Sequence, residues 1–195
     1  MMQVNVRQIA GNWDAGYALD KHMLHSEYIG DDDRGRPQFN NTRTEVGQAL
    51  YELKYNGHHF DRVEPLAEAL AQHIVPLLPD IGLLIPMPAS NVRARQPVTE
   101  ITEALGRIIE RPVFLNILTK SANGQQLKDL NTKEEKQAAL QGSFALDEGI
   151  TSEGQWNALI VDDLHHTGAS LEAACATLRG YRKIAGIFVA AVTWR

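Results

Sequence analysis

The stretch that decides the fold runs from Leu159 to Ser170 and reads LIVDDLHHTGAS. Its opening apolar run is typical of a strand that is buried on both faces of a parallel sheet. Asp162 and Asp163 follow at the carboxyl end of that strand, and a small-residue turn around Gly168 then opens a helix over residues 170–178. Ligands of open α/β sheets bind at the carboxyl ends of the strands, so this segment predicts a binding site at one edge of a sheet.

The turn after the acidic pair has the features of a phosphate site. Backbone N–H groups at a helix start lack intrahelical partners, and the helix dipole adds partial positive charge there. Gly168 lets a ligand approach the backbone, and Thr167 and Ser170 add hydroxyl donors. A sugar attached to that phosphate would meet Asp162 and Asp163, whose carboxylates accept hydrogen bonds from hydroxyls and stabilise positive charge at an anomeric carbon.

A plainer interpretation exists for the same residues, because an acidic pair can be a solvated loop and Thr-Gly-Ala-Ser can simply cap a helix. The combination of strand, spacing and helix favours the phosphate site. Two other phosphate motifs are excluded. No Gly-Lys-Ser/Thr follows the glycine, as a Walker loop requires, and the chain has no Gly-x-Gly-x-x-Gly fingerprint.

Strands and helices alternate through the rest of the chain. Apolar runs that predict strands lie at 81–88, 113–118, 158–161 and 187–192. Helical periodicity predicts helices from 42, from 61, over 98–108 and over 170–178. This alternation predicts an α/β fold with a doubly wound, mainly parallel sheet over residues 42–195.

The N-terminal segment, residues 1–41, is expected to form a small hood-like unit. Residues 16–29 are strand-like, and residues 30–41 are polar and rich in turn formers, which predicts a loop. Thr42 and Glu45 fit a capping box, with Thr42 as the N-cap of the first helix.

The composition of the chain argues against several classes of protein. The chain of 195 residues has 19 basic and 24 acidic residues, a formal charge of −5, which argues against nucleic acid as its main partner. One cysteine, Cys175, excludes an internal disulfide and a cysteine zinc ribbon, and its helical spacing predicts a buried side chain. No signal peptide and no apolar run long enough to cross a bilayer are present, so we expect a soluble, cytoplasmic protein.

Residues 159–170 resemble the phosphoribosyl diphosphate (PRPP) motif of type I phosphoribosyltransferases. Other segments resemble the ComF-like branch of that family, which is related to amidophosphoribosyltransferases: LKYNG at 53–57, IPMP at 85–88 with Arg93 and Arg95 after it, and the Gln-rich stretch 125–144. The resemblance covers roughly residues 45 to 195 in the same order. The zinc ribbon of that branch has no counterpart here, and His166 stands where the phosphate loop usually has a threonine.

The resemblance implies a Mg²⁺-dependent transfer of phosphoribosyl from PRPP to a nitrogen acceptor, with release of diphosphate. It assigns the 5-phosphate to His165, His166, Thr167, Gly168, Ala169 and Ser170. It assigns the diphosphate to Met87, Pro88, Ala89, Ser90, Arg93 and Lys54. The implied catalytic residues are Asp162, Asp163, Lys120 and Lys128, and the two aspartates hold Mg²⁺ through water.

Two other functions stay open. One is a non-catalytic PRPP- or nucleotide-binding regulator of the ComF type, with residues 1–41 as the partner surface. The other is an interaction protein in which the loop is vestigial. Type I members are often dimers, so a homodimer is expected.

His22 and His25 are not predicted to bind a metal, because their spacing on a strand points them to opposite faces. Trp194 at the end of the last strand is expected to pack rather than to bind a base.

Overall fold

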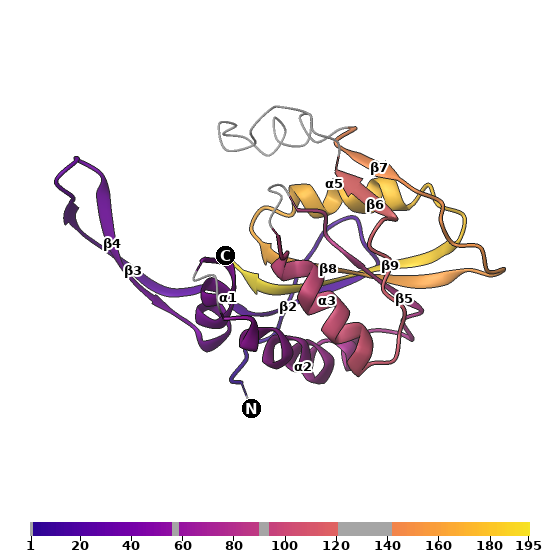
Figure 1. Ribbon diagram of the computed structural model, residues 1–195, viewed down its shortest axis with the longest axis horizontal. Helices are drawn as coiled ribbons and strands as arrows, with labels where there is room; N and C mark the ends of the chain where they lie inside the picture. The colour runs from indigo at the N-terminus through magenta and orange to yellow at the C-terminus, as the bar shows by residue number, and fades with distance from the viewer. Residues whose placement is uncertain (1, 56–58, 90–93, 121–141) are drawn as a thin grey trace.

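A five-stranded sheet forms the centre of the computed structural model, which describes residues 2–55, 59–89, 94–120 and 142–195 (Figure 1). Its strands, in spatial order, are β1 (Arg7–Gln8), β2 (Ala15–Lys21), β9 (Ile184–Trp194), β8 (Trp156–His165) and β5 (Leu83–Pro86). Neighbouring strands from β2 to β5 are parallel, and β1 is antiparallel to β2. Since the four parallel strands share a direction, their carboxyl ends lie at one edge of the sheet.

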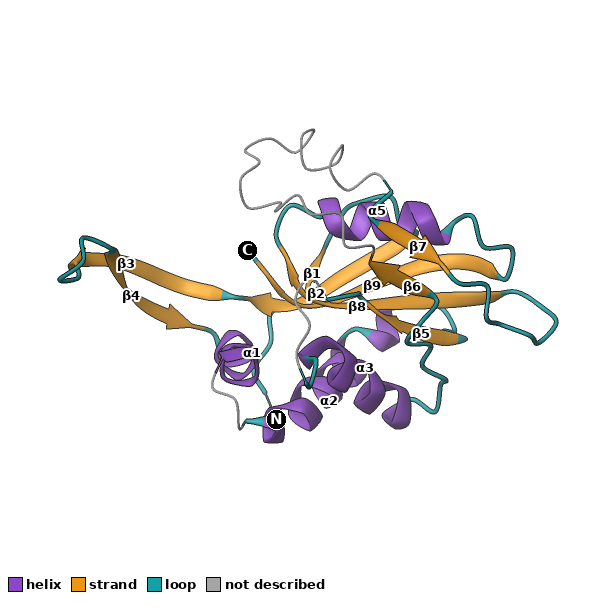
Figure 2. Ribbon diagram, turned by 45° about the horizontal axis from the view of Figure 1, so that its top comes forward, coloured by secondary structure: helices purple, strands orange, loops and turns teal. Residues whose placement is uncertain are grey.

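Helices cover both faces of this sheet (Figure 2). Helices α1 (Glu45–Tyr55), α2 (Val63–His73) and α3 (Pro97–Ile108) lie on one face, and α5 (Ala169–Leu178) lies on the other. Short 3₁₀ turns at Phe60–Arg62 and Val75–Leu77 flank α2. A small hairpin of β6 (Leu118–Lys120) and β7 (Phe144–Leu146) lies beside α5. The predicted doubly wound, mainly parallel α/β fold is confirmed.

The central strand β8 shows why the sequence folds in this way. Residues 158–161 have no measurable exposure, and alternate side chains enter two different apolar clusters. Ala158 and Ile160 pack on the side of α5, whereas Leu159 and Val161 pack on the side of the other helices. A continuous apolar run places apolar side chains on both faces of the sheet, as expected for a central parallel strand.

The N-terminal segment differs from the predicted hood-like unit of strand and loop. Residues 7–21 belong to the main sheet, because β2 lies between β1 and β9. Residues 23–43 form a projecting antiparallel hairpin of β3 (Met23–Asp31) and β4 (Pro37–Arg43). The predicted loop over 30–41 is therefore wrong for residues 30–31, which end β3, and for residues 37–41, which belong to β4. Phe39 is the one large apolar side chain of 37–41, so this stretch lacks the apolar alternation that marks a strand.

The cap of α1 also differs from the predicted capping box. Thr42 lies in β4 opposite His25, and the hydroxyl of Thr44 caps the helix by accepting a hydrogen bond from the Gly47 amide at 2.9 Å. The carboxylate of Glu45 accepts a hydrogen bond from the amide of Gln3 instead of reaching back to the cap. Pairing of residue 42 with β3 takes precedence over local capping.

The predicted strand over 113–118 is only partly formed. Val113 makes a single parallel bridge with Leu84, and Leu118 begins β6, which pairs with β7 outside the main sheet. Within the described ranges, no helix combines the length and the apolar character that a membrane crossing needs.

Candidate functional site

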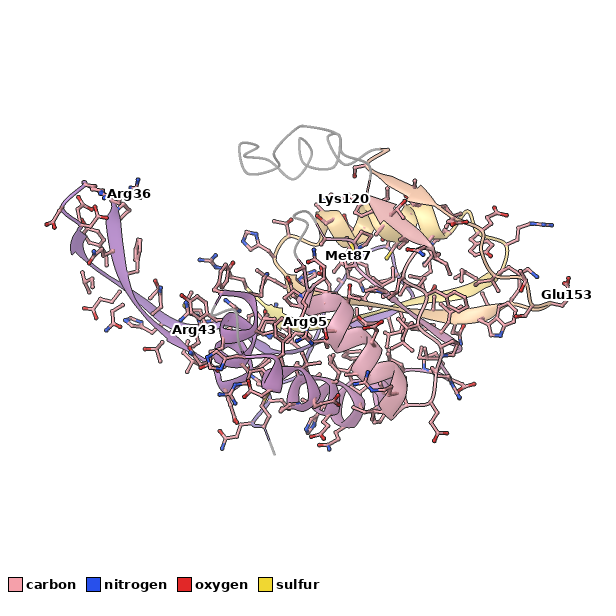
Figure 3. The ribbon with its side chains drawn as sticks, in the orientation of Figure 1. Arg36, Arg43, Met87, Arg95, Lys120 and Glu153 are labelled. Atoms are coloured by element: carbon pink, nitrogen blue, oxygen red, sulfur yellow. The ribbon has the colours of Figure 1, made fainter. Side chains whose placement is uncertain are left out.

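A cleft of about 300 Å³ opens at the carboxyl edge of the sheet. It is bordered by the end of β8, the segment after β5, the last turn of α1, the start of α3, one residue of β6 and the first turn of α5. Its lining residues are Lys54, Met87, Pro88, Ala89, Gln96, Pro97, Val98, Thr99, Lys120, Asp162, Asp163, Leu164 and Ser170. Met87 and Lys120 are labelled in Figure 3. The cleft lies where ligands bind in open α/β sheets.

The two carboxylates of the acidic pair at the end of β8 have different neighbours. Successive residues of a strand point to opposite faces of the sheet. Asp163 accepts a hydrogen bond from the ammonium group of Lys54 on α1, with Nζ and Oδ2 2.8 Å apart. Both side chains are only about one-fifth exposed, at 20% and 22%. Lys54, expected to contact diphosphate, thus lies against the predicted sugar-binding carboxylate.

Asp162, the other carboxyl of the pair, borders the same cleft as Asp163. Burial raises the pKa of this carboxyl to about 7, and the negative charge of Asp163 adds to the effect. A hydrogen bond of 2.8 Å from the Asp163 amide to Oδ1, together with the positive charges of Lys54 and Lys120, acts in the opposite direction. Burial also lowers the pKa of the Lys120 ammonium. Burial therefore favours the neutral, protonated form of the Asp162 carboxyl.

The segment after β5 lies next to the acidic pair in space. The Met87 amide donates a hydrogen bond of 2.8 Å to the carbonyl of Val161, which extends the β5–β8 pairing by one residue. Met87, Pro88 and Ala89 consequently border the cleft beside Asp162. Ser90 and Arg93, the other residues predicted for diphosphate, lie outside the described residues. The neighbouring Arg95 pairs with Glu100 at 2.7 Å and stacks on Phe60.

The predicted phosphate loop turns sharply at Gly168. This residue has φ +77°, a left-handed conformation that favours glycine, and it is the N-cap of the ten-residue helix α5. A Cβ at this position would lie 3.1 Å from Nε2 of His165 and 3.7 Å from the ring of Trp13. The Ala169 amide reaches the hydroxyl of Thr167 at 3.5 Å. The loop therefore packs closely against the end of its own strand.

The structure brings most of the predicted site residues together. Those that line the cleft are Lys54, Met87, Pro88, Ala89, Lys120, Asp162, Asp163 and Ser170. Residues 165–169 lie next to the cleft, between Leu164 and Ser170 of its lining, without lining it themselves. Lys128 lies outside the described residues. The predicted catalytic and phosphate-binding positions thus share one edge of the sheet, although they come from distant parts of the chain.

Sequence reasoning missed two parts of the site. Residues 96–99 at the start of α3 line the cleft, and a proline at the first helical position was the signal for this helix N-terminus. Trp13 is buried against Gly11 and Gly16, donates a hydrogen bond of 3.0 Å to the carbonyl of Ile9, and meets His165 edge-on at 6.1 Å. No local sequence pattern predicts that Trp13 packs against a loop more than 150 positions away in the chain.

Metal and nucleophile candidates are few. In the described part of the chain, no three His, Cys, Asp or Glu side chains are grouped to hold a metal ion by themselves. Asp162 and Asp163 nevertheless offer the oxygen ligands that Mg²⁺ prefers, and Mg²⁺ is commonly held by one or two carboxylates together with water and substrate phosphates. Cys175 is buried, as predicted, and burial raises the pKa of its thiol to about 12, so the thiolate nucleophile is disfavoured.

Comparisons with known proteins connect this architecture to one fold. No protein-family model and no curated protein match the chain. Among solved structures, the glutamine PRPP amidotransferase of B. subtilis, complexed with ADP and GMP, is 12% identical with a TM-score of 0.50, over 82% of this chain and 34% of that chain. An adenine phosphoribosyltransferase is 14% identical with a TM-score of 0.43, over 88% and 86% of the two chains.

The adenine phosphoribosyltransferase of Saccharomyces cerevisiae, complexed with an iminoaltritol bisphosphate and adenine, is 13% identical with a TM-score of 0.43, over 87% and 84% of the chains. At such identities the comparison concerns the fold. This chain has an α/β fold whose structural neighbours are type I phosphoribosyltransferases, and it spans about a third of the length of the amidotransferase.

Proposed function

We propose that this protein is a Mg²⁺-dependent phosphoribosyltransferase, which binds PRPP and transfers its phosphoribosyl group to a nitrogen acceptor with release of diphosphate. The observation that carries this proposal is the single cleft that collects the acidic pair of β8, the segment after β5 and the first turn of α5. The fold supports it, because the structural neighbours are phosphoribosyltransferases. The sequence elements at 53–57, 85–88 and 125–144 resemble the ComF-like branch, and we propose that the chain belongs to it.

The sugar would lie along the end of β8. The loop 166–170 holds the 5-phosphate through backbone amides at the start of α5, and Ser170 contributes its hydroxyl. Asp162 and Asp163 accept hydrogen bonds from the ribose hydroxyls and stabilise the positive charge that develops at C1. Lys54 holds the carboxylate of Asp163 in place through the 2.8 Å contact. We expect Asp163 to contribute most, because this lysine fixes its position.

The leaving group would lie over the segment after β5. The bond between C1 and the diphosphate oxygen breaks, and the nitrogen lone pair of the acceptor forms the new bond to C1 as the acceptor loses a proton. Residues 87–89, the N-terminus of α3 and the ammonium group of Lys120 face the developing negative charge. Ser90, Arg93 and Lys128 are further proposed contacts. Mg²⁺, bound by Asp162 and Asp163 through water, would neutralise diphosphate charge.

A second candidate is a non-catalytic protein that binds PRPP or a nucleotide and responds by changing its affinity for a partner. The projecting β3–β4 hairpin favours this alternative. Its exposed side chains include Leu24, Tyr28, Ile29 and Phe39, at 50% exposure or more, which is unusual for side chains with no role in contacts.

The test is calorimetric titration of PRPP with and without Mg²⁺, for the natural protein, Asp163→Asn and the control Asp33→Asn. Asp33 is an exposed aspartate at the hairpin turn, so this control changes the same charge far from the cleft. We expect Mg²⁺-dependent binding that Asp163→Asn weakens at least tenfold and that Asp33→Asn leaves unchanged. Absence of binding under every condition contradicts both candidates.

Turnover separates the two candidates. Diphosphate release is measured with PRPP, Mg²⁺ and a panel of nucleobases and ammonia. Release that requires one acceptor and is lost in Asp163→Asn supports the transferase. PRPP binding with no diphosphate release for any acceptor supports the binding protein instead.

A further inference from the structure

A cluster of cationic and aromatic side chains lies beside the phosphate loop, at the end of β9. We define the Arg7 cluster as Arg7, Lys21, His165 and Trp194. The guanidinium carbon of Arg7 lies 4.5 Å from the centroid of the Trp194 ring, and the ammonium group of Lys21 lies 5.9 Å from the same ring. Both distances are typical of cation–π contacts, so one indole ring holds two positive charges near the edge of the sheet.

This cluster is continuous with the loop. Trp194 is paired with His165 in the register of β8 and β9, and the Arg195 amide donates a hydrogen bond of 3.0 Å to the carbonyl of His165. The loop starts at the next residue, His166. It then returns to the same place at Gly168, where a Cβ would lie 3.1 Å from Nε2 of His165.

The charges of the cluster point to an anionic ligand. Arg7 is exposed, and within the described ranges no carboxylate forms an ion pair with it. The buried Nε2 of His165 and Nε1 of Trp194 have no hydrogen-bond partner among the described residues. Buried polar atoms normally have a partner, which a ligand or water can supply.

We propose that Arg7, held on the ring of Trp194, is a further binding residue for the phosphate monoester of the substrate in the loop 166–170. This assignment rests on the proposed function and extends it to a strand that precedes the recognised motif by more than 150 residues. A guanidinium group forms paired hydrogen bonds with phosphate, which the imidazole of His166 cannot do. Lys21 adds a second positive charge to the same phosphate at longer range.

The test uses two probes that separate the ends of PRPP. Ribose 5-phosphate carries the sugar and the phosphate monoester but no diphosphate, and inorganic diphosphate with Mg²⁺ represents only the leaving group. We expect Arg7→Gln to weaken binding of ribose 5-phosphate and PRPP about tenfold and to leave diphosphate binding unchanged. Lys21→Gln is expected to weaken the same two ligands about twofold to threefold. The matched control is Arg34→Gln at the hairpin turn, which is expected to change none of the three affinities.

Variants of the ring test how Arg7 is held. Trp194→Phe keeps an aromatic face and is expected to retain most of the affinity for ribose 5-phosphate, whereas Trp194→Leu is expected to lose about as much as Arg7→Gln. Circular dichroism and the melting temperature show whether each variant folds, and a double variant Arg7→Gln/Trp194→Leu no weaker than either single variant shows that the two residues act together.

The outcomes separate this inference from the function on which it rests. If the natural protein binds neither PRPP nor ribose 5-phosphate, the proposed function fails. If it binds both and Arg7→Gln binds ribose 5-phosphate as tightly as the natural protein, the proposed function stands and the role of Arg7 is refuted. Equal weakening of ribose 5-phosphate and diphosphate in Arg7→Gln also refutes it, because the residue would then support the whole site.

Discussion

The strand β8 and the β3–β4 hairpin are both built from extended chain, yet they are held in opposite ways. Residues 158–161 of β8 are fully buried between two strands and two layers of helices. The hairpin is exposed over most of its length, and it extends away from the sheet, with Arg43 at its base and Arg36 near its turn (Figure 3). Its contacts run across its own two strands, as in the pair of Tyr28 with Phe39 at 5.8 Å.

This difference determines which part of the molecule can position chemical groups. Asp162 and Asp163 occupy fixed places because the strand that carries them is packed on both sides. An isolated two-stranded hairpin is only marginally stable in water, so the hairpin is poorly suited to the precise placement of chemical groups. We therefore expect substitutions near the sheet to have large effects and substitutions on the hairpin to have small ones.

The largest effect is expected where α1 meets the root of the hairpin. A Cβ at Gly47 would lie 2.1 Å from the carbonyl oxygen of His22, so Gly47→Ala forces the helix away from the sheet. We expect a loss of about 3 kcal/mol in the free energy of unfolding, measured by urea denaturation. The control Gly149→Ala, where the nearest atom is 3.9 Å away, is expected to be nearly neutral. A neutral Gly47→Ala would mean that the packing of α1 is looser than the structure shows.

Removal of the lysine partner of Asp163 is expected to have the next largest effect. Lys54→Met leaves a partly buried carboxylate without its 2.8 Å contact, which is expected to cost about 1–2 kcal/mol of stability and to weaken PRPP binding about tenfold. The control is Lys183→Met, because Lys183 pairs at 3.5 Å with Glu153, which lies at the end of the molecule opposite the hairpin (Figure 3). Equal effects of the two variants on PRPP affinity would contradict the role of Lys54.

A smaller, pH-dependent effect is expected at Asp162. Burial raises its pKa to about 7 in the folded protein, above the ordinary value of an aspartate, so the folded state retains the proton more strongly than the unfolded state. The stability of the natural protein should therefore fall as the pH rises from about 4 to about 7. Asp162→Asn removes this cost and is expected to raise the melting temperature at pH 8, although it weakens PRPP binding.

The measurement is thermal unfolding of both proteins from pH 4 to pH 8. The gain from Asp162→Asn is expected to be small at pH 4, where the natural carboxyl is protonated, and full above pH 7. A gain that does not change with pH would show that Asp162 is not the group that titrates. Asp33→Asn serves as the control.

The smallest effect is expected on the hairpin. Tyr28→Thr and Phe39→Thr remove an exposed ring pair, so we expect the unfolding free energy of the whole protein to change by less than about 0.5 kcal/mol and PRPP affinity to stay unchanged. Amide protection in β3 and β4, measured by hydrogen exchange, is expected to fall, because cross-strand aromatic pairs stabilise a hairpin. A large loss of global stability would show that the hairpin is part of the folded core.

The sequence predicted the elements whose own apolar pattern matches the buried faces that they occupy in the fold. The apolar runs of β5, β8 and β9 and the periodicity of α2, α3 and α5 carry their structure locally. The hairpin, the cap at Thr44 and the pairing of β6 with β7 were missed or only partly predicted. Each of these depends on a partner strand that makes the backbone hydrogen bonds, and polar exposed strands leave no apolar alternation to detect.

The candidate site also has one part that the local sequence predicts and one part that depends on contacts between distant segments. The order of Asp162, Asp163 and the Gly168 turn on a buried strand is a local property, so the amino-acid sequence alone determined that an acidic pair and a helix start share one sheet edge. Only the tertiary structure brought Lys54, Lys120 and residues 96–99 to the same cleft and seated Arg7 on Trp194. The reason is physical: strand and helix periodicity act over a few residues, whereas contacts between distant segments are set by how the layers pack around the sheet.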